Sequence, residues 1–286
     1  MDFCIKKSFK TLFDNPHIML LFVTYLLAFS GLISAVVFVA GKPLFYVAVI
    51  LIFLLTCAFF AGWLGMIKCL VAFKETDNAE ENLKNKYTSF SIGFFSSVAN
   101  YILPVIFYFI LFMAFIRGLL SLASNIFNGS IETAGHIAAL MSNQDALLNY
   151  LSTLPDNELI ALVKFNAFVY FGILLYLFLT FYAIPSVYFN EKTANPLSGL
   201  KNGFLSLCKK PFYSAGIFLI LLFSHVILVF FERISFINPV LMFIALVLRV
   251  SFIAYVIVLI FSVYEKNFTD NGNNGTDRIR ENEPCN

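Results

Sequence analysis

The chain has 286 residues, of which 60% are hydrophobic and only 13% are charged, and its mean hydropathy is +0.84. Soluble domains are about half apolar and about one quarter charged, so these values exclude an ordinary water-soluble domain. The formal net charge of +2 is too small to indicate nucleic acid as a partner.

Six stretches, taken in chain order, are apolar and long enough to cross a bilayer, for which a helix needs about 20 apolar residues. They are Ile18–Gly41, Pro43–Ile67, Asn100–Ile116, Phe165–Phe189, Pro211–Phe231 and Ile234–Tyr264. The third is short, but the apolar segment Phe90–Val98 extends it backward. The first exceeds the apolar core of a cleaved signal peptide, about 7–15 residues, so we expect it to be retained. The sequence predicts an all-α polytopic membrane protein, with its transmembrane domain at residues 1–264.

Lysine and arginine are distributed unevenly over the two sides of these spans. Of the 19 such residues, fourteen fall on the side that holds both termini, four fall on the other side, and Arg249 lies inside the sixth span. Cytoplasmic loops carry the excess of positive charge in membrane proteins. We therefore expect a multi-pass protein of the plasma or inner membrane, with its N- and C-termini in the cytoplasm.

The connections between the spans differ in length and character. We expect tight turns at Gly41–Pro43 and at Glu232–Ser235, and a charged cytoplasmic loop at Lys68–Tyr87. The tail, residues 265–286, is rich in Asn, Gly and charge, and is predicted to be disordered.

The sizeable outside connection is a helical insertion at about residues 123–163. Ser142 and Asp145 form a capping box that predicts a short helix over Asn143–Leu151. Pro155-Asp156 predicts the start of a second helix, which leads into the fourth span.

A short pattern of a small residue, Phe, any residue and Ser or Thr occurs three times, at Ser8–Leu12, Gly93–Ser97 and Gly203–Leu207. In two copies a proline follows at the same distance, Pro16 and Pro211, just before a span. Each copy predicts an amphipathic helix on the cytoplasmic face followed by two spans, which gives three two-span repeats with the same orientation. The alternative is that juxtamembrane segments of any Phe-rich protein share this pattern.

Two segments carry a family resemblance. Lys6–Leu27 resembles the opening of the YciC-like bacterial inner-membrane proteins, which are related to the membrane domain found beside glycerophosphodiester phosphodiesterases. Tyr170–Phe223 resembles their succession of a span that ends in a proline, a short acidic turn, a small-residue amphipathic helix and the next span. The resemblance implies a six-helix membrane domain of poorly defined function. It does not carry over the phosphodiesterase activity, because the catalytic barrel is not part of this sequence.

Arg249 is the sharpest candidate for a buried polar or ligand-binding residue, because a charge about halfway along a span faces a bundle interior or a cavity by default. We find no Asp or Glu inside the six predicted spans, so the sequence suggests no acid to pair with it. It could bind helix-end carbonyls, hydroxyls or an anionic lipid or substrate, or it could snorkel toward the cytoplasmic interface or fix helix packing. His225, next to Ser224 in the fifth span, is a second candidate, and we expect an interhelical hydrogen bond there rather than a proton relay.

Pro104 and Pro185 are candidate helix kinks, because each removes the hydrogen bond to a carbonyl one turn earlier, and broken helices build substrate sites in transporters. Pro185 could instead simply end its helix. Six lysines lie beside Phe and Leu in the amphipathic segments and are candidate contacts for lipid headgroups. They are Lys6, Lys7, Lys10, Lys201, Lys209 and Lys210.

Three classes of function remain open. We favour a non-enzymatic membrane or envelope protein that works through helix and lipid contacts, with membrane lipids as partners and protein partners undefined. The alternative is a transporter or permease-like subunit for a lipid-like or anionic substrate. A membrane-embedded enzyme is the least supported class, since the sequence offers no acid pair or nucleophile–base pair near a membrane face. No cofactor or metal is expected, because His17, His136 and His225 are widely separated.

Overall fold

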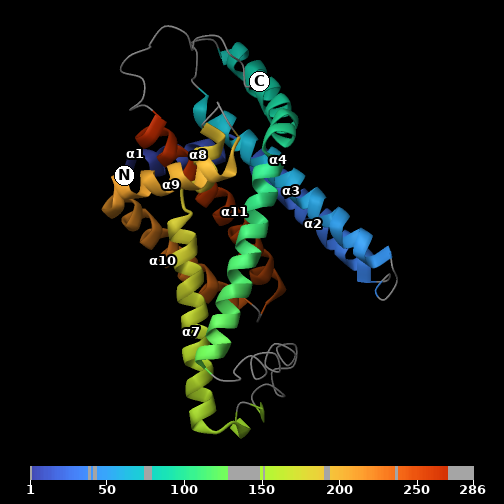
Figure 1. Ribbon diagram of the computed structural model, residues 1–286. Coiled ribbons are helices and arrows are strands. Elements are labelled where there is room, and N and C mark those ends of the chain that lie inside the picture. Colours follow the sequence, from blue (N-terminus) through green and yellow to red (C-terminus); the bar gives the residue numbers. More distant parts are fainter. Residues whose placement is uncertain are drawn as a thin grey trace. The chain divides into compact units, whose positions relative to one another are not determined.

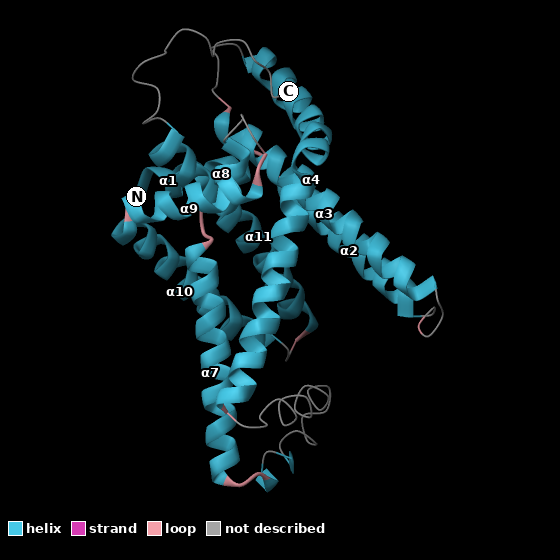
Figure 2. Cartoon of the chain, viewed as in Figure 1, coloured by secondary structure: helices cyan, strands magenta, loops and turns pink. Residues whose placement is uncertain are grey.

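The computed structural model describes residues 2–37, 40, 44–73, 79–127, 149–150, 152–189, 194–235 and 238–269 (Figure 1). The regular elements in this part of the chain are helices, as predicted (Figure 2). The chain folds into two compact units. Residues Met1–Phe107 and Thr180–Asn286 form the first unit, and Tyr108–Leu179 form the second.

In the described part of the chain, six helical segments are long and apolar enough to cross a membrane, as the sequence predicts. Their helices are α2 (His17–Val37), α3 (Leu44–Ala72), α4 (Ala79–Ile126), α7 (Asp156–Leu179) followed by α8 (Ala183–Phe189), α10 (Pro211–Ser235) and α11 (Pro239–Tyr264). All six match predicted spans, with bounds that differ by a few residues at most ends.

The turn between the last two spans is not where we expected it. Residues Glu232–Ser235 form the last turn of α10, so the tight turn predicted there is wrong. The next helix begins later, where the side chain of Asn238 accepts a hydrogen bond of 2.8 Å from the backbone N–H of Val240. Asn is a preferred N-cap residue, and Pro239 suits the first helical position because its missing N–H is not needed there.

The buried core of the first unit lies at one end of its spans, where α2 begins and α3 and α11 end. Trp63 is fully buried there; its ring lies 4.7 Å from that of Phe22, and its Nε1 donates to the carbonyl of Ile18 at 3.1 Å. The hydroxyl of Tyr188 in α8 donates to the carbonyl of Ala61 at 3.0 Å. We call this end the basal end of the unit.

The opposite halves of these spans expose apolar side chains. Examples are Leu26 and Leu27 in α2, Leu51 and Leu55 in α3, Phe223 and Phe230 in α10, and Phe243 and Leu246 in α11. Exposed Leu and Phe in such numbers are incompatible with water but suit a hydrocarbon environment. The core of the first unit is therefore concentrated at the basal end, and the rest of its spans is available to lipid.

Two amphipathic helices, α1 (Asp2–Phe13) and α9 (Pro196–Lys209), lie at the basal end as separate elements (Figure 1). In each, a small residue of the repeated pattern is buried, and a proline eight residues later, Pro16 or Pro211, starts the next span. The second copy has Tyr101 at that distance from Gly93, and α4 continues through it to Ile126. The third separate amphipathic helix that we expected is therefore part of α4, because no proline stops the helix.

Two of the repeated segments pack closely on the span that precedes them. A Cβ atom added to Gly65 of α3 would lie 1.8 Å from Oγ of Ser97 in α4. A Cβ atom added to Gly203 of α9 would lie 2.6 Å from the backbone nitrogen of Ala183 at the start of α8. Small residues thus let each helix approach the backbone of its predecessor.

The first repeated segment packs on the last span of the chain. The ring of Phe9 in α1 lies 4.8 Å from that of Tyr255 in α11. Each of the three segments therefore contacts the second span of the preceding pair, and the contact of α1 with α11 closes the cycle. A cyclic order of this kind fits the expected arrangement of three two-span repeats.

In the second unit, the end of α4 packs against α7. A Cβ atom on Gly172 would lie 2.6 Å from Cδ1 of Leu119, and the rings of Phe115 and Tyr176 stack at 4.5 Å. Helix α7 begins directly after Pro155, as predicted. Most of the helix expected over Asn143–Leu151 lies outside the described residues, apart from Asn149 and Tyr150, which are helical.

Candidate functional site

Arg249 has an acidic partner. Its Nη1 lies 2.6 Å from Oε2 of Glu232 in the last turn of α10, so the expectation that no acid in the spans would pair with it is wrong. The reason is that α10 extends beyond Phe231 and carries Glu232 within the hairpin. The side chains are 41% and 25% exposed, respectively, so Arg249 lies partly exposed on the hairpin rather than deep in a core.

This ion pair changes what Arg249 can do. The side chain of Arg249 points back along α11 toward Glu232, at the end of α10 that is opposite to the basal end. Pairing lowers the cost of holding a charge beside hydrocarbon. An anionic ligand could bind the guanidinium only by competing with Glu232, which holds it at hydrogen-bond distance.

His225 makes a ring contact between α10 and α11. Its imidazole lies 6.3 Å from the ring of Phe252, with 22° between the two planes. The hydroxyl of Ser224 donates to the carbonyl of Ile220 in its own helix, at 2.9 Å. Ser224 thus bonds along α10, and the contact that His225 shows across the hairpin is aromatic packing.

The two candidate kink prolines have different surroundings. Helix α7 ends at Leu179, and Pro185 follows in the first turn of α8, where a missing N–H is tolerated. The break in the fourth span therefore precedes Pro185. Pro104 is buried and lies inside α4, which remains helical on both sides of it.

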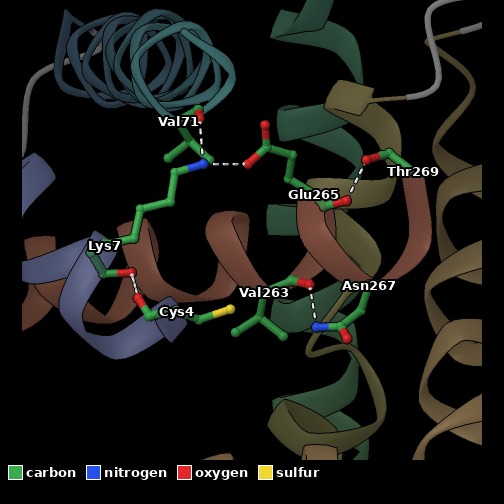
Figure 3. A network of polar contacts seen from close by, with 8 residues as sticks. Cys4, Lys7, Val71, Val263, Glu265, Asn267 and Thr269 are labelled. Atoms are coloured by element: carbon green, nitrogen blue, oxygen red, sulfur yellow. Dashed lines mark hydrogen bonds and ion pairs between the residues drawn. The ribbon is translucent and has the colours of Figure 1, made fainter. Parts of the chain in front are cut away.

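The six candidate lysines divide into two groups by exposure, of which the first is only partly exposed and bonds other elements of the protein. Lys7 donates to the carbonyl of Val71 at 3.0 Å and pairs with Glu265 at 2.8 Å (Figure 3). Lys210 donates to Oδ1 of Asn267 at 2.8 Å. Neither ammonium group points freely to a membrane surface.

The bonds of Lys7 and Lys210 hold a short π-helix, η1 (Glu265–Thr269), that continues α11. The amide of Asn267 donates to the carbonyl of Val263, and Thr269 bonds to the carbonyl of Glu265 (Figure 3). The ordered chain thus continues five residues into the tail that we expected to be disordered, while residues 270–286 lie outside the described part. We call Lys7, Val71, Glu265, Lys210 and Asn267 the basal clasp.

The clasp joins elements that are far apart in the sequence. Val71 is next to the last residue of α3, so Lys7 binds one of the carbonyls that a helix end leaves without a partner. Its second bond reaches the end of the last span. One side chain of α1 therefore ties together the second and the sixth span.

The second group of lysines, Lys6, Lys10, Lys201 and Lys209, is exposed. Lys6 and Lys10 share a face of α1 with Phe3, Phe9 and Phe13, which are also exposed. Lys201 and Lys209 lie on the exposed face of α9 with Leu197, Phe204 and Leu205. We call these two surfaces the outer faces of α1 and α9.

The acidic and amide members of these contacts are not predicted by the sequence. Glu232 was assigned to a turn and Glu265 and Asn267 to a tail, so neither site was recognised. One signal was available: no Gly or Pro follows Tyr264 until Gly272, and Phe268 stands one helical turn after Tyr264. The distance in sequence between Lys7 and Glu265 left no local pattern that could pair them.

No family model matches the chain, and no curated protein and no solved structure matches it either. Its resemblance to the YciC-like proteins therefore stays a prediction. Among the described residues, no group of three or more His, Cys, Asp or Glu is placed to hold a metal ion.

Proposed function

We propose that this chain is a non-enzymatic multi-pass protein of the cell membrane, a scaffold or envelope protein that acts through contacts of its helices with lipid and with one another. The observation that carries the proposal is the long apolar surface of the spans, which exposes Leu, Ile, Val and Phe over the halves remote from the basal end. A surface of this kind has hydrocarbon as its natural environment.

Two ion pairs support the same proposal. Arg249 and Glu232 neutralise each other, and Lys7 and Glu265 hold two spans together. Both pairs are explained by packing, because each joins two helices. Neither is arranged as an acid–base pair around an open site.

A transporter for a lipid-like or anionic substrate is the second candidate, and Arg249 is the observation that favours it. A half-exposed guanidinium beside the apolar surface of α10 and α11 could hold an anionic headgroup if Glu232 released it. In a scaffold, the same ion pair instead stays formed and holds α10 to α11.

Native mass spectrometry of the full-length protein in a mild detergent tests the two candidates. For a lipid-contacting scaffold, we expect phospholipid to stay bound, and Arg249→Gln to leave the amount of bound lipid unchanged while lowering the unfolding temperature. For a transporter that holds its substrate at Arg249, the bound lipid would fall and the unfolding temperature would stay the same. A protein that retains no lipid at all would contradict the proposed function.

A further inference from the structure

The outer face of α1 combines aromatic and basic side chains. Phe3, Lys6, Lys10 and Phe13 follow a spacing of three or four residues, which places them on one side of a helix, and Phe9 lies between them. Phe13 remains 69% exposed. Lys266 adds a further charge beside this face, with its Nζ 3.8 Å from the centre of the Phe3 ring.

The outer face of α9 combines the same two kinds of side chain as that of α1, although the two helices are far apart in the sequence. Leu197, Lys201, Phe204 and Leu205 repeat at helical spacing, and Lys209 follows on the same side. Phe212, just after α9, is 92% exposed. No Asp or Glu occurs in α9, so the face is purely basic and apolar.

The inner faces of both helices differ from that of a soluble amphipathic helix, because most of their buried residues are small. The buried side of α1 holds Cys4, Ser8 and Leu12, and that of α9 holds Gly199, Gly203, Ser206 and Leu207. In a soluble amphipathic helix the large apolar residues would face the core and the small polar ones the solvent. Here one leucine of each helix is buried, but Phe3, Phe13, Phe204 and Leu205 face outward, as in a helix that lies in a membrane interface.

We infer that the outer faces of α1 and α9 dock onto anionic phospholipid headgroups of the membrane leaflet at the basal end. Phe and Leu side chains enter the boundary between headgroups and acyl chains, and Lys6, Lys201 and Lys209 pair with headgroup phosphates. This inference rests on the proposed function, because it requires the spans to be in a bilayer. The occupant is an anionic lipid surface because both faces couple large apolar side chains with exposed lysines, and α9 contains no acidic residue.

The lysines of the basal clasp are a control for this inference, because they lie in or directly beside the same two helices. Lys7 is the neighbour of Lys6, and Lys210 is the neighbour of Lys209, but both are bonded to Glu265 or Asn267. Sequence position alone would assign all of these lysines to the membrane. The structure assigns headgroup binding to Lys6, Lys201 and Lys209 and internal fastening to Lys7 and Lys210.

Two double variants of the full-length protein test this assignment: Lys6→Gln with Lys201→Gln, and Lys7→Gln with Lys210→Gln. Each double variant removes one positive charge in α1 and one in or directly after α9. The formal net charges of the two variants are therefore the same. The proteins are equilibrated in mixed micelles that contain phosphatidylcholine and phosphatidylglycerol in equal amounts, and the bound lipid is identified by native mass spectrometry.

We expect the wild-type protein to be enriched in phosphatidylglycerol, and the Lys6 and Lys201 variant to lose at least about fivefold of that enrichment, the effect of one lysine near an anionic surface. The Lys7 and Lys210 variant should keep the enrichment and unfold at a lower temperature. Equal loss in both variants, or unchanged enrichment in the first, would overturn the inference.

A second measurement separates this inference from the proposed function. If the wild-type protein retains both lipids without preference, the anionic docking faces are wrong while the lipid-contacting function stands. If it retains neither lipid, both fail. Emission of the single Trp63, which is buried in the core, reports whether each variant is folded.

Discussion

Lys6 and Lys7 are adjacent, yet their side chains have opposite roles in the structure. Successive residues of a helix point about 100° apart, and here this rotation sends Lys6 outward and Lys7 into the basal clasp. The ammonium group of Lys7 bonds a carbonyl at the end of α3 and the carboxylate of Glu265. Both partners lose their bond if the charge is removed.

We predict that Lys7→Gln lowers the free energy of unfolding by about 1–2 kcal/mol, since the side chains of Lys7 and Glu265 are 32% and 23% exposed and hydrogen bonds to charged groups are worth about 1.5–3 kcal/mol when protected. Lys6→Gln is the matched control and should change the stability by less than about 0.5 kcal/mol. Thermal unfolding followed by Trp63 emission in the same detergent measures both. A larger loss for Lys6→Gln than for Lys7→Gln would contradict the clasp.

The pair of Arg249 and Glu232 allows a double-mutant cycle. We predict that Arg249→Gln and Glu232→Gln each destabilise the protein by about 2 kcal/mol, a value between those of exposed and buried pairs. The double variant should be less destabilised than the sum of the two, because neither charge is left alone. Additive losses would show that the two side chains do not interact in the membrane.

At the scale of helices, α9 lies directly against the backbone at the start of α8. The atoms that an added Cβ on Gly203 would meet belong to the backbone of Tyr182 and Ala183, so a rotamer change cannot relieve the overlap. The neighbouring contact is polar: Ser186 of α8 donates to the carbonyl of Gly199 at 2.6 Å. The two helices are therefore held at a distance that only glycine allows.

We predict that Gly203→Ala costs about 1–3 kcal/mol through overpacking. Gly216→Ala in α10 is the control: nothing lies within 4 Å of its added Cβ, and Ala is a better helix former than Gly by about 1 kcal/mol. Circular dichroism during heating measures both. The interpretation is wrong if Gly203→Ala is as stable as the wild type.

How far the sequence predicts the elements depends on whether the signal is local. The spans follow from hydropathy, and the start of α7 from Pro155-Asp156. The Asn-Pro pairs at Asn195 and Asn238 cap α9 and α11, so the starts of both helices also have a local signal in the sequence. The pattern predicts a separate helix at the second copy by analogy with the first and third copies. The second copy lacks their proline, however, and α4 is continuous.

The candidate contacts were less predictable than the elements. Arg249 was recognisable because a charge in a span is rare, but its partner depended on one extra turn of α10. The pairing of Lys7 with Glu265 depends on α1 folding onto the end of α11, which hydropathy does not report. Charge alone thus grouped six lysines that the tertiary structure separates into two groups.

At the scale of the whole molecule, the cycle of contacts in the first unit gives the basal end a particular role. The end of α3, the end of α11 and both separate amphipathic helices meet there, and the core residues Trp63 and Tyr188 lie among them. Over the halves of the spans that are remote from the basal end, many large apolar side chains are exposed. We therefore expect the stability of this unit to depend on the basal end more than on contacts along the spans.

We predict the orientation of the molecule in the membrane from the distribution of its lysines and arginines. Fourteen of the 19 Lys and Arg residues fall on the side of the termini, so that side should face the cytoplasm. A fluorescent protein that folds only in the cytoplasm should be active when fused after Asn286, and inactive when inserted in the region 123–163. Alkaline phosphatase, which is active only after export, should give the opposite result at the same two positions. Exchanged activities would invert the topology and would also remove the docking faces of α1 and α9 from the cytoplasmic leaflet, whereas equal activity of one reporter at both sites would contradict the number of spans between them.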